Sequence, residues 1–369
     1  MNQNYTFDII RLTNKFPLLS SIIKQVIFWI MAYSMLLYII HLVAFSVFNI
    51  FDRTIEVGVW PVFVFVIIAS LFLGISLGLL DGFLKKTFFK NQPLGVNILV
   101  GSLSYFLVLM GIIVISRNVI INISADFPTK GDVEILLEEN WNYFSYILMV
   151  YTFFMTLVIS FVNQMNQKFG PGMLLPFLFG RYRYPREEER IFMFLDLTSS
   201  TELAEKLGHV RYSKLIQASF LDINKKVKEF NAEIYQYVGD EVVISWPLQG
   251  FKKAACVEFF FSVQEMFLER KEFYEKEFGV VPKFKAGLHA GLVTAVEVGD
   301  IKRDIAYHGD TLNVAARIEG LCNEYHAPIL ASGLIIEKGK LQDFFSVTSL
   351  GFKSLQGRQS PIEIFRITK

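Results

Sequence analysis

The sequence predicts a membrane α-helical bundle followed by an α+β domain, and three observations support this fold class. The 369 residues are 53% hydrophobic and only 19% charged, with a mean hydropathy of +0.40, which is too apolar for a typical soluble protein. The long apolar runs lie before about residue 165. After about residue 180 strand and helix patterns alternate. We therefore expect a membrane domain over residues 1–165, a connecting element over 166–189 and a soluble domain over 190–369.

Four apolar segments are each long enough to span a hydrocarbon core of roughly 30 Å. They are Val26–Phe48, Gly58–Leu80, Val96–Ile115 and Tyr143–Val162. Each is expected to be a helix, because separate spans can satisfy their backbone groups only as helices. The N-terminal segment has no cleavage-site pattern, so the first span is interpreted as a retained anchor in the lipid bilayer.

Basic residues give the expected orientation of the spans. The link between the second and third spans contains Lys85, Lys86 and Lys90, and further basic residues precede the first span and follow the fourth. The other two connections are acidic or mixed. Both termini are therefore expected in the cytoplasm.

Two features inside the spans each have two interpretations. Gly74 and Gly78 lie one turn apart and predict a close helix contact, either within one chain or between two chains. His41 is either a haem or quinone ligand or a hydrogen-bonded packing residue. The spans otherwise offer almost no polar groups, so we expect an anchor or a sensor and not a transport pathway.

Cysteine content and net charge exclude several classes of site. Cys256 and Cys322 are too few for a disulfide framework or a zinc site. The net charge of +1 gives no indication of a nucleic-acid partner.

The soluble half begins after a helix-breaking segment at Gly170, Pro171 and Gly172, which a short connecting helix is expected to follow. Ile191–Leu197 is a continuous apolar strand. The run Ser199–Glu202 fits a capping box that opens a helix. A long helix is predicted next, because apolar residues recur three or four positions apart and would form one face: Ile216, Phe220, Ile223, Val227 and Phe230.

The remaining elements predict a ferredoxin-like βαββαβ core. Glu233–Val238 and Val242–Trp246 flank a Gly-Asp-Glu turn, which indicates a hairpin. The later helices are expected over Phe251–Glu277 and Thr311–Cys322, and the later strands over Lys283–His289, Val293–Val298, Ile329–Ala331, Phe345–Leu350 and Ile362–Ile367. The opening order β-α-β-β-α-β describes a ferredoxin-like core. Because that core hosts many functions, the function has to be inferred from the residues of the site and not from the fold.

Asp196 stands in the apolar run IFMFLDL, where an isolated carboxylate is costly to bury. In the predicted core, the first strand lies beside the hairpin, so Asp196 is expected to face Asp240 of YVGDE. Two converging carboxylates repel each other unless a cation lies between them. A hard divalent ion such as Mg²⁺ suits oxygen ligands and leaves room for phosphates. The alternative is that Asp196 only flanks a helix and Asp240 is an ordinary turn residue.

Two further elements are suited to phosphate chemistry. Backbone N–H groups of the helix beginning after Thr198 can receive phosphate oxygens. Asn313 and Arg317 in HGDTLNVAARIEGL are four residues apart and share a helix face. An amide and a guanidinium together can orient a ribose and stabilise charge on a transferring phosphoryl group. Alone, Arg317 would be read as a solvated surface residue.

These elements, in this order, resemble the class III nucleotidyl cyclases, the adenylate and guanylate cyclases. The resemblance is carried by FLDLTSST with Asp196, YVGDE with Asp240, and GDTLNVAARIE with Asn313 and Arg317, and it covers about residues 186–369. It implies that residues 190–369 are a catalytic domain. RYRYPREEER looks like the connector of membrane-bound bacterial members, which implies a location in the bacterial cytoplasmic membrane.

The resemblance implies a mechanism in which ATP is converted to 3′,5′-cyclic AMP and pyrophosphate with two Mg²⁺ or Mn²⁺ ions. Asp196 and Asp240 would bridge the metals, with the carbonyl of Leu197 as a further ligand, and Asn313 and Arg317 would act on the ribose and α-phosphate. In this family the two groups come from different subunits, which implies a homodimer with its sites at the interface. Further implied substrate-binding positions are Thr198, Ser199, Ser200, Thr201 and Gly239.

The resemblance is weakest where the base would be recognised. Gln236 stands in place of the usual lysine and Ala306 in place of its usual Asp or Thr partner, whereas a guanylate cyclase would show Glu and Cys. A glutamine amide matches the acceptor and donor edge of adenine, so adenine is favoured over guanine. Asp304 is near enough in the sequence to compensate. Near the end of the domain, either Lys353 or Arg358 is expected to bind phosphate, and both fit an ordinary loop charge equally well.

Other functions stay open on the sequence alone. One is a guanylate cyclase, and another is a cyclase-like module that holds nucleotide or dimerises without turnover, supported only by Gln236 and Ala306. A diguanylate cyclase is disfavoured because those enzymes have no downstream Asn-x-x-x-Arg helix. We expect the membrane bundle to set the dimer geometry through the Gly170–Glu189 connector.

Overall fold

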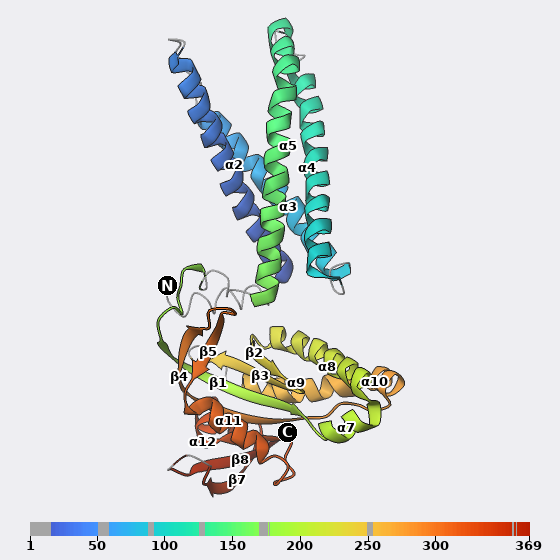
Figure 1. Cartoon of the computed structure of the whole chain (residues 1–369), viewed down its shortest axis with the longest axis vertical. Helices are drawn as coiled ribbons and strands as arrows, with labels where there is room; N and C mark the ends of the chain where they lie inside the picture. Colours follow the sequence, from blue (N-terminus) through green and yellow to red (C-terminus); the bar gives the residue numbers. More distant parts are fainter. Residues whose placement is uncertain are drawn as a thin grey trace. The chain divides into compact units, whose positions relative to one another are not determined.

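The computed structural model describes residues 16–50, 59–87, 92–124, 130–169, 176, 178–248, 254–355, 358 and 360–369. The chain divides into two compact units, Phe16–Pro171 and Gly172–Lys369. The first is helical and the second contains a sheet with helices on it (Figure 1). The predicted helix-breaking residues Gly170, Pro171 and Gly172 lie outside the described residues.

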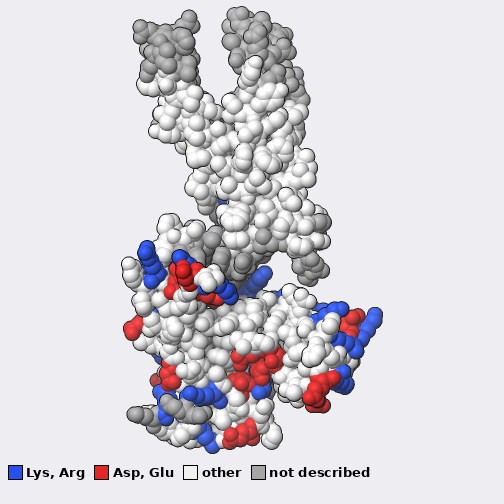
Figure 2. All heavy atoms as spheres, in the orientation of Figure 1, with Lys and Arg blue, Asp and Glu red and all other residues white. Residues whose placement is uncertain are grey.

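The described part of the first unit consists of α2 (Pro17–Ile50), α3 (Val59–Thr87), α4 (Leu94–Ser124) and α5 (Lys130–Phe169). These helices contain four segments long and apolar enough to cross a membrane, Pro17–Val43, Val66–Leu84, Gly95–Val114 and Ser145–Asn166. On the face seen in Figure 2, the helices carry almost no charged side chains. The four predicted spans are confirmed as apolar helices, although the first begins at Pro17 and not at Val26.

Helices α2 and α3 pack closely within the chain. A Cβ added at Gly74 would lie 2.5 Å from Cα of Val26, and one added at Gly78 would lie 2.5 Å from Cα of Ile22. Of the two interpretations of this glycine motif, the contact within one chain is confirmed. His41 is exposed on α2, so it does not pack inside this bundle.

A buried polar network lies inside the helical unit. Asp81 of α3 is 1% exposed and accepts hydrogen bonds from the Ser21 hydroxyl and, at 2.9 Å, from the Tyr105 hydroxyl. Gln25 is also buried and accepts a hydrogen bond from Trp29 Nε1 at 3.1 Å. The expectation that these spans offer almost no polar groups is therefore wrong. It failed because Asp81 was assigned to the loop after the second span, whereas α3 continues past it.

The described part of the second unit forms an eight-stranded sheet. Its strands are β1 (Arg186–Leu197), β2 (Glu233–Val238), β3 (Glu241–Pro247), β4 (Phe284–Val298), β5 (Asp304–His308), β6 (Ile329–Ser332), β7 (Ser346–Lys353) and β8 (Ile362–Thr368). Its helices include α7 (Ser200–Leu207), α8 (His209–Glu229), α9 (Ala255–Glu269), α10 (Lys271–Phe278), α11 (Asp310–Gly320) and α12 (Gly333–Gly339).

The strand order is β2-β3-β1-β4-β6-β8-β7, with β5 paired to the far part of β4. The first four strands are antiparallel to their neighbours, and β6 runs parallel to β4. The order β2-β3-β1-β4, with helices between β1 and β2 and between β3 and β4, is the predicted ferredoxin-like core.

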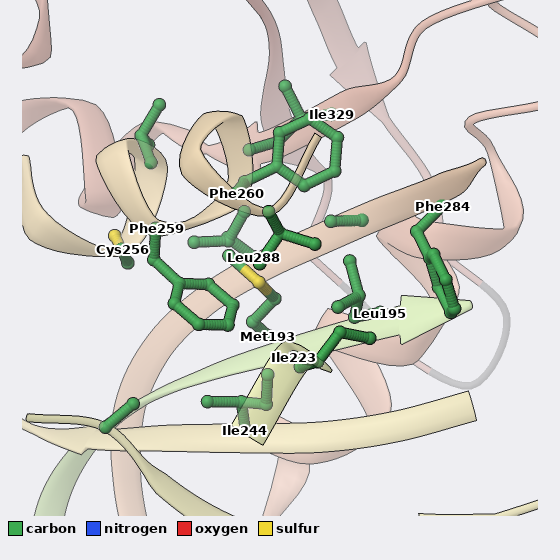
Figure 3. Packing of buried hydrophobic residues seen from close by; sticks show 14 of the residues in the cluster. Met193, Leu195, Ile223, Ile244, Cys256, Phe259, Phe260, Phe284, Leu288 and Ile329 are labelled. Carbon is green, nitrogen blue, oxygen red and sulfur yellow. The ribbon is translucent and has the colours of Figure 1, made fainter. Parts of the chain in front are cut away.

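Strand β1 presents side chains to both faces of the sheet. Ile191, Met193 and Leu195 belong to the main core, where they meet helices α8 and α9 (Figure 3). Phe192 belongs to a different cluster that includes Ala315 of α11. Because side chains alternate along a strand, Asp196 falls on the Phe192 face. The carboxylate therefore interrupts an apolar run without entering the main core.

The predicted capping box is wrong. Ser199 precedes α7 in the left-handed conformation, with φ 55°, and its side chain makes no capping hydrogen bond. A capping residue normally holds an extended backbone so that its oxygen reaches the N–H groups of the first turn. The helix that follows is nevertheless present, and it starts at Ser200.

Two other boundaries differ from the prediction, and two short elements were not predicted. The helix expected over Phe251–Glu277 is interrupted at Arg270, which separates α9 from α10. The two strands expected over Lys283–His289 and Val293–Val298 are one continuous strand, β4. Gly291 between them makes room for a helix and does not form a turn, since an added Cβ would lie 2.5 Å from Thr311 Oγ1. The short β5 and α12 were not predicted, because neither carries a clear apolar period.

The close packing of α11 on β4 predicts the effect of a glycine substitution. A Cβ at Gly287 would lie 2.2 Å from the backbone nitrogen of Glu319 and 2.5 Å from the carbonyl oxygen of Ala315. We expect Gly287→Ala to lower the free energy of unfolding of this unit by about 1–3 kcal/mol, because backbone atoms must move. Thermal unfolding of the purified full chain measures the change.

The matched control is Gly320→Ala at the end of the same helix, where an added Cβ meets nothing within 4 Å. This change should leave the transition temperature unchanged or raise it slightly, because alanine has the higher helix propensity. Equal losses in the two variants would contradict the packing argument.

Candidate active site

Two carboxylates converge where β1 ends. Asp196 of β1 lies in register with Glu241 of β3 on one side and with Lys285 of β4 on the other. Asp240 lies in the turn that joins β2 to β3, after Gly239, whose φ of 61° suits glycine. Burial raises the pKa of Asp196, and the negative charge of Asp240 raises that pKa further. The structure thus brings the two predicted carboxylates together.

A lysine that sequence reasoning missed lies between Asp196 and Glu319. Lys285 Nζ is 3.3 Å from Asp196 Oδ2 and 2.7 Å from Glu319 Oε1 of α11. Burial raises the pKa of Glu241 to about 7, and the neighbouring charges of Glu319, Asp196 and Asp240 contribute to the increase. Asp196 and Glu319 share the Lys285 ammonium group, and the charges of Glu241 and Asp240 lie close to them. Such an excess of negative charge favours binding of a cation.

The donor set fits a hard divalent ion bound together with a nucleotide. The carboxylates of Asp196 and Asp240 and the carbonyl group of Leu197 offer only oxygen atoms, which Mg²⁺ and Mn²⁺ prefer. Among the residues that the structure describes, no group of three or more His, Cys, Asp or Glu residues could hold a metal by itself. Mg²⁺ commonly uses one or two carboxylates and completes its shell with water and phosphate oxygens.

The predicted phosphate-binding turn lies directly after this strand. The N–H group of Thr198 donates to the carbonyl oxygen of Lys283 at 2.8 Å, so it is already used within the fold. Helix α7 starts at Ser200, and its first-turn N–H groups, including that of Thr201, have no acceptor inside the helix. The first turn of α7 is therefore a better phosphate-binding candidate than Thr198.

Asn313 and Arg317 lie on α11, away from the carboxylates. Ala315 and Glu319 of α11 pack on β4. Asn313 and Arg317 each lie two residues before one of them, so their side chains point about 200° around the helix from that contact. Asn313 is exposed, and Arg317 Nη1 is buried with no hydrogen-bond partner among the described residues. In the described part of one chain, no hydrogen bond or ion pair joins either residue to Asp196 or Asp240.

The predicted base-recognition positions lie on β2 and β5. Gln236 is exposed and lies opposite Val243, directly after an irregularity in the β2–β3 pairing at Tyr235. Ala306 is half-buried and lies opposite Val296 of β4. Asp304 at the start of β5 is exposed.

Lys353 and Arg358, the two candidate phosphate-binding residues, both already contact other side chains of the domain. The ammonium group of Lys353 lies 4.9 Å from the centroid of the Tyr325 ring. Arg358 Nη1 is 2.8 Å from Asp310 Oδ2, which ties this loop to the helix that carries Asn313. Gln356, between them, lies outside the described residues.

Residues 183–368, half of the chain, match the family described as "Adenylate and Guanylate cyclase catalytic domain". This chain belongs to that family. The sheet unit is therefore its cyclase domain, and the converging carboxylates lie within the matched residues.

Similar proteins include two from Rhizobium meliloti (strain 1021). Adenylate cyclase 2 is 34% identical over 222 residues, which are 60% of this chain and 61% of that protein. Adenylate cyclase 1 is 28% identical over 187 residues, which are 49% of this chain and 27% of that protein. The alignments therefore span less than two thirds of either relative. Among solved structures, the adenylyl cyclase CyaB from P. aeruginosa is 19% identical with a TM-score of 0.44, over 50% of this chain and 96% of that one.

The acidic cluster predicts a pH-dependent response to metal ions. Without metal, the pKa of Glu241 is raised from 4.5 to about 7 in the folded chain, so the folded state binds more protons than the unfolded state between these values. The metal-free cyclase domain should therefore lose stability as pH rises through this range. Added Mn²⁺ should raise the unfolding temperature more at pH 8 than at pH 5, because protons no longer compete for the carboxylates.

Differential scanning calorimetry of the full chain with and without Mn²⁺ measures this response. Asp240→Asn should remove most of the Mn²⁺ effect at pH 8. Asp304→Asn, at an exposed carboxylate outside the cluster, should keep it. An Mn²⁺ effect of the same size in all three proteins would show that the ion binds elsewhere.

Proposed function

We propose that the chain is a membrane-bound adenylate cyclase that converts ATP to 3′,5′-cyclic AMP and pyrophosphate as a homodimer. The observation that carries this proposal is the convergence of Asp196 and Asp240 beside the first turn of α7, in a domain of the cyclase family. The four apolar helices support attachment to a membrane. We place both termini on the cytoplasmic side of a bacterial inner membrane, because the basic residues of the connections gather on one side.

In the proposed reaction, the 3′-oxygen of ATP forms a bond with the α-phosphorus, and the bond from that phosphorus to the pyrophosphate oxygen breaks. The proton of the 3′-hydroxyl group passes to water, and pyrophosphate departs with the electron pair of the broken bond. Two Mg²⁺ or Mn²⁺ ions, when bound, supply charge neutralisation at the phosphates and acidify the attacking hydroxyl group. Asp196, Asp240 and the Leu197 carbonyl group would hold them.

Two residues of α11 would act on the substrate directly. The guanidinium group of Arg317 would stabilise the negative charge that develops on the α-phosphate, since a fixed cation there needs no reorganisation during the reaction. The Asn313 amide would orient the ribose so that its 3′-oxygen is aligned for attack. The buried Nη1 atom of Arg317, which has no partner among the described residues, supports a role toward a ligand.

The separation of these two groups supports the proposed homodimer. Within the described part of one chain, no hydrogen bond or ion pair joins Asn313 or Arg317 to the carboxylate pair. A second copy related by twofold symmetry would supply the missing half at each of two sites. Substrate-binding groups from both copies would then complete each site.

Adenine is the proposed base. The exposed amide of Gln236 offers a donor and an acceptor that complement N1 and the amino group of adenine. Ala306 leaves that position without a polar group, so Gln236 carries the discrimination, with the exposed carboxylate of Asp304 nearby in β5.

The direct test is an assay of the detergent-purified full chain with Mn²⁺ and either ATP or GTP, with detection of the cyclic product. We expect cyclic AMP from the wild type and a loss of at least about 100-fold in Asp196→Ala, because a ligand to the catalytic metals is removed. Cyclic GMP as the main product would identify a guanylate cyclase and contradict the base assignment. No product from a dimeric sample would favour a cyclase-like module without turnover.

A complementation assay tests the shared site. Asp196→Ala and Arg317→Ala chains should each be inactive as homodimers. Random pairing of equal amounts should restore about a quarter of wild-type activity, because half of the dimers are mixed and each mixed dimer has one intact site. Two chains carrying Asp196→Ala and Asp240→Ala provide the control, since their mixed dimers contain no intact site. Equal activity in the two mixtures would contradict a shared site.

A further inference from the structure

Arg190 is a buried cation of β1, six residues before Asp196. It is 4% exposed, although an arginine is costly to remove from water. Its Nη1 atom is 3.2 Å from Glu188 Oε2, and its Nη2 atom is 2.9 Å from Ser245 Oγ and also pairs with Glu233. The carboxylates of Glu233 and Glu188 keep the pKa of Arg190 raised although burial opposes its charge.

The same guanidinium group contacts β5. Its central carbon lies 5.0 Å from the centroid of the Tyr307 ring, which is within range of a cation–π interaction. Glu233 is the first residue of β2, and Tyr307 directly follows Ala306 in β5. The Arg190 side chain of β1 therefore contacts both β2 and β5, the two strands that carry the proposed base-recognition positions.

Tyrosine side chains connect those two strands to each other. The rings of Tyr235 and Tyr307 lie 5.0 Å apart, and the N–H group of Tyr307 donates to the Tyr235 hydroxyl at 3.3 Å. Tyr235 also occupies the bulge in β2, directly before Gln236. A bulge re-aims the side chain that follows it, so the position of Tyr235 helps to set where Gln236 points.

The network extends into the segment between α5 and β1. Tyr182 is 6% exposed, and its hydroxyl group donates to Glu188 Oε1 at 3.2 Å. Its carbonyl oxygen accepts from the N–H group of Glu297 in β4 at 2.7 Å. The end of the connector is therefore bound to the carboxylate that holds Arg190.

We propose that Arg190 is a positioning residue for purine recognition, which fixes β2 and β5 so that Gln236 and Ala306 keep one relative position. Its influence passes through Glu233 to β2 and through Tyr307 to β5, and Glu188 ties it to Tyr182 of the connector. This inference rests on the proposed function, since it concerns the base of the nucleotide that the cyclase domain would bind.

An arginine suits this role better than another cation or an apolar residue. Its planar group can bind two oxygen partners in fixed directions while one face stacks on a ring, which a lysine ammonium group cannot do. An apolar side chain would fill the space but would leave Glu188 and Glu233 without their cation. Arg190 thus fixes the orientation of Glu188, Glu233 and Tyr307 as well as filling the space between them.

The test compares Arg190→Lys with the wild type in the full chain. We measure Kd for fluorescent ATP and GTP analogues and, with turnover, KM and kcat for both nucleotides. The ATP-to-GTP preference should change by at least about 5-fold, mainly through Kd and KM, because the base contacts are misplaced. The Mn²⁺ concentration for half-maximal activity should stay within about twofold, because Asp196 is about 20 Å away along the strand.

Tyr235→Phe is a milder variant in case Arg190→Lys folds poorly. It removes only the hydroxyl group that accepts from Tyr307, and it should change the preference in the same direction by about 2-fold or more. Arg270→Lys is the matched control. Arg270 pairs with buried Asp222 and lies 4.4 Å from the Phe273 ring centroid, but its partners belong to the helical layer. It should lose comparable stability and keep the wild-type preference.

An unchanged preference in both Arg190→Lys and Tyr235→Phe would overturn the inference, as would an equal change in Arg270→Lys. The binding assay separates this result from a failure of the proposed function. A wild type that binds nucleotide without turnover would refute the cyclase activity, while the Kd ratios would still decide the role of Arg190. A wild type that binds neither analogue would overturn both.

Discussion

The register of β1 between β3 and β4 is the constraint on which the rest of the cyclase domain depends. It aligns Asp196 with Glu241 and Lys285 and directs all three to one face of the sheet. A slip of one residue would send Asp196 into the main core and bring Leu195 to the site face, because side chains alternate along a strand. The dense apolar packing of Met193 against α8 and α9 makes such a slip costly. Core packing therefore positions the carboxylate.

The second constraint is the close approach of α11 to β4. Gly287 and Gly291 leave room for the backbone and side chains of the helix. That approach brings Glu319 within 2.7 Å of Lys285 and so completes the acidic cluster around one ammonium group. It also turns the opposite face of α11 away from the cluster, and Arg317 Nη1 has no hydrogen-bond partner among the described residues. The same packing contact thus builds one half of the proposed site and separates the other half from it.

The helical unit contains a buried polar network as well as apolar side chains. Asp81 lies buried between α2, α3 and α4, where it accepts hydrogen bonds from Ser21 and Tyr105. A carboxylate inside a membrane segment is costly unless its oxygens are satisfied. These hydrogen bonds join α3 to both α2 and α4, whereas the glycine contact joins only α2 and α3. Polar groups as well as apolar packing therefore define the arrangement of this unit.

The sequence by itself determined the spans, the strand and helix types around the site, the ferredoxin-like order and the carboxylate pair. These follow from local apolar periods and short motifs, which depend on neighbouring residues. Only the tertiary structure decided the contacts of Lys285, Glu319 and Arg190, because most of their partners come from strands and helices far away in the sequence. The partners of Asp81, Ser21 and Tyr105, are likewise distant in the sequence. Local patterns specify elements, whereas the register between distant elements decides which charges meet.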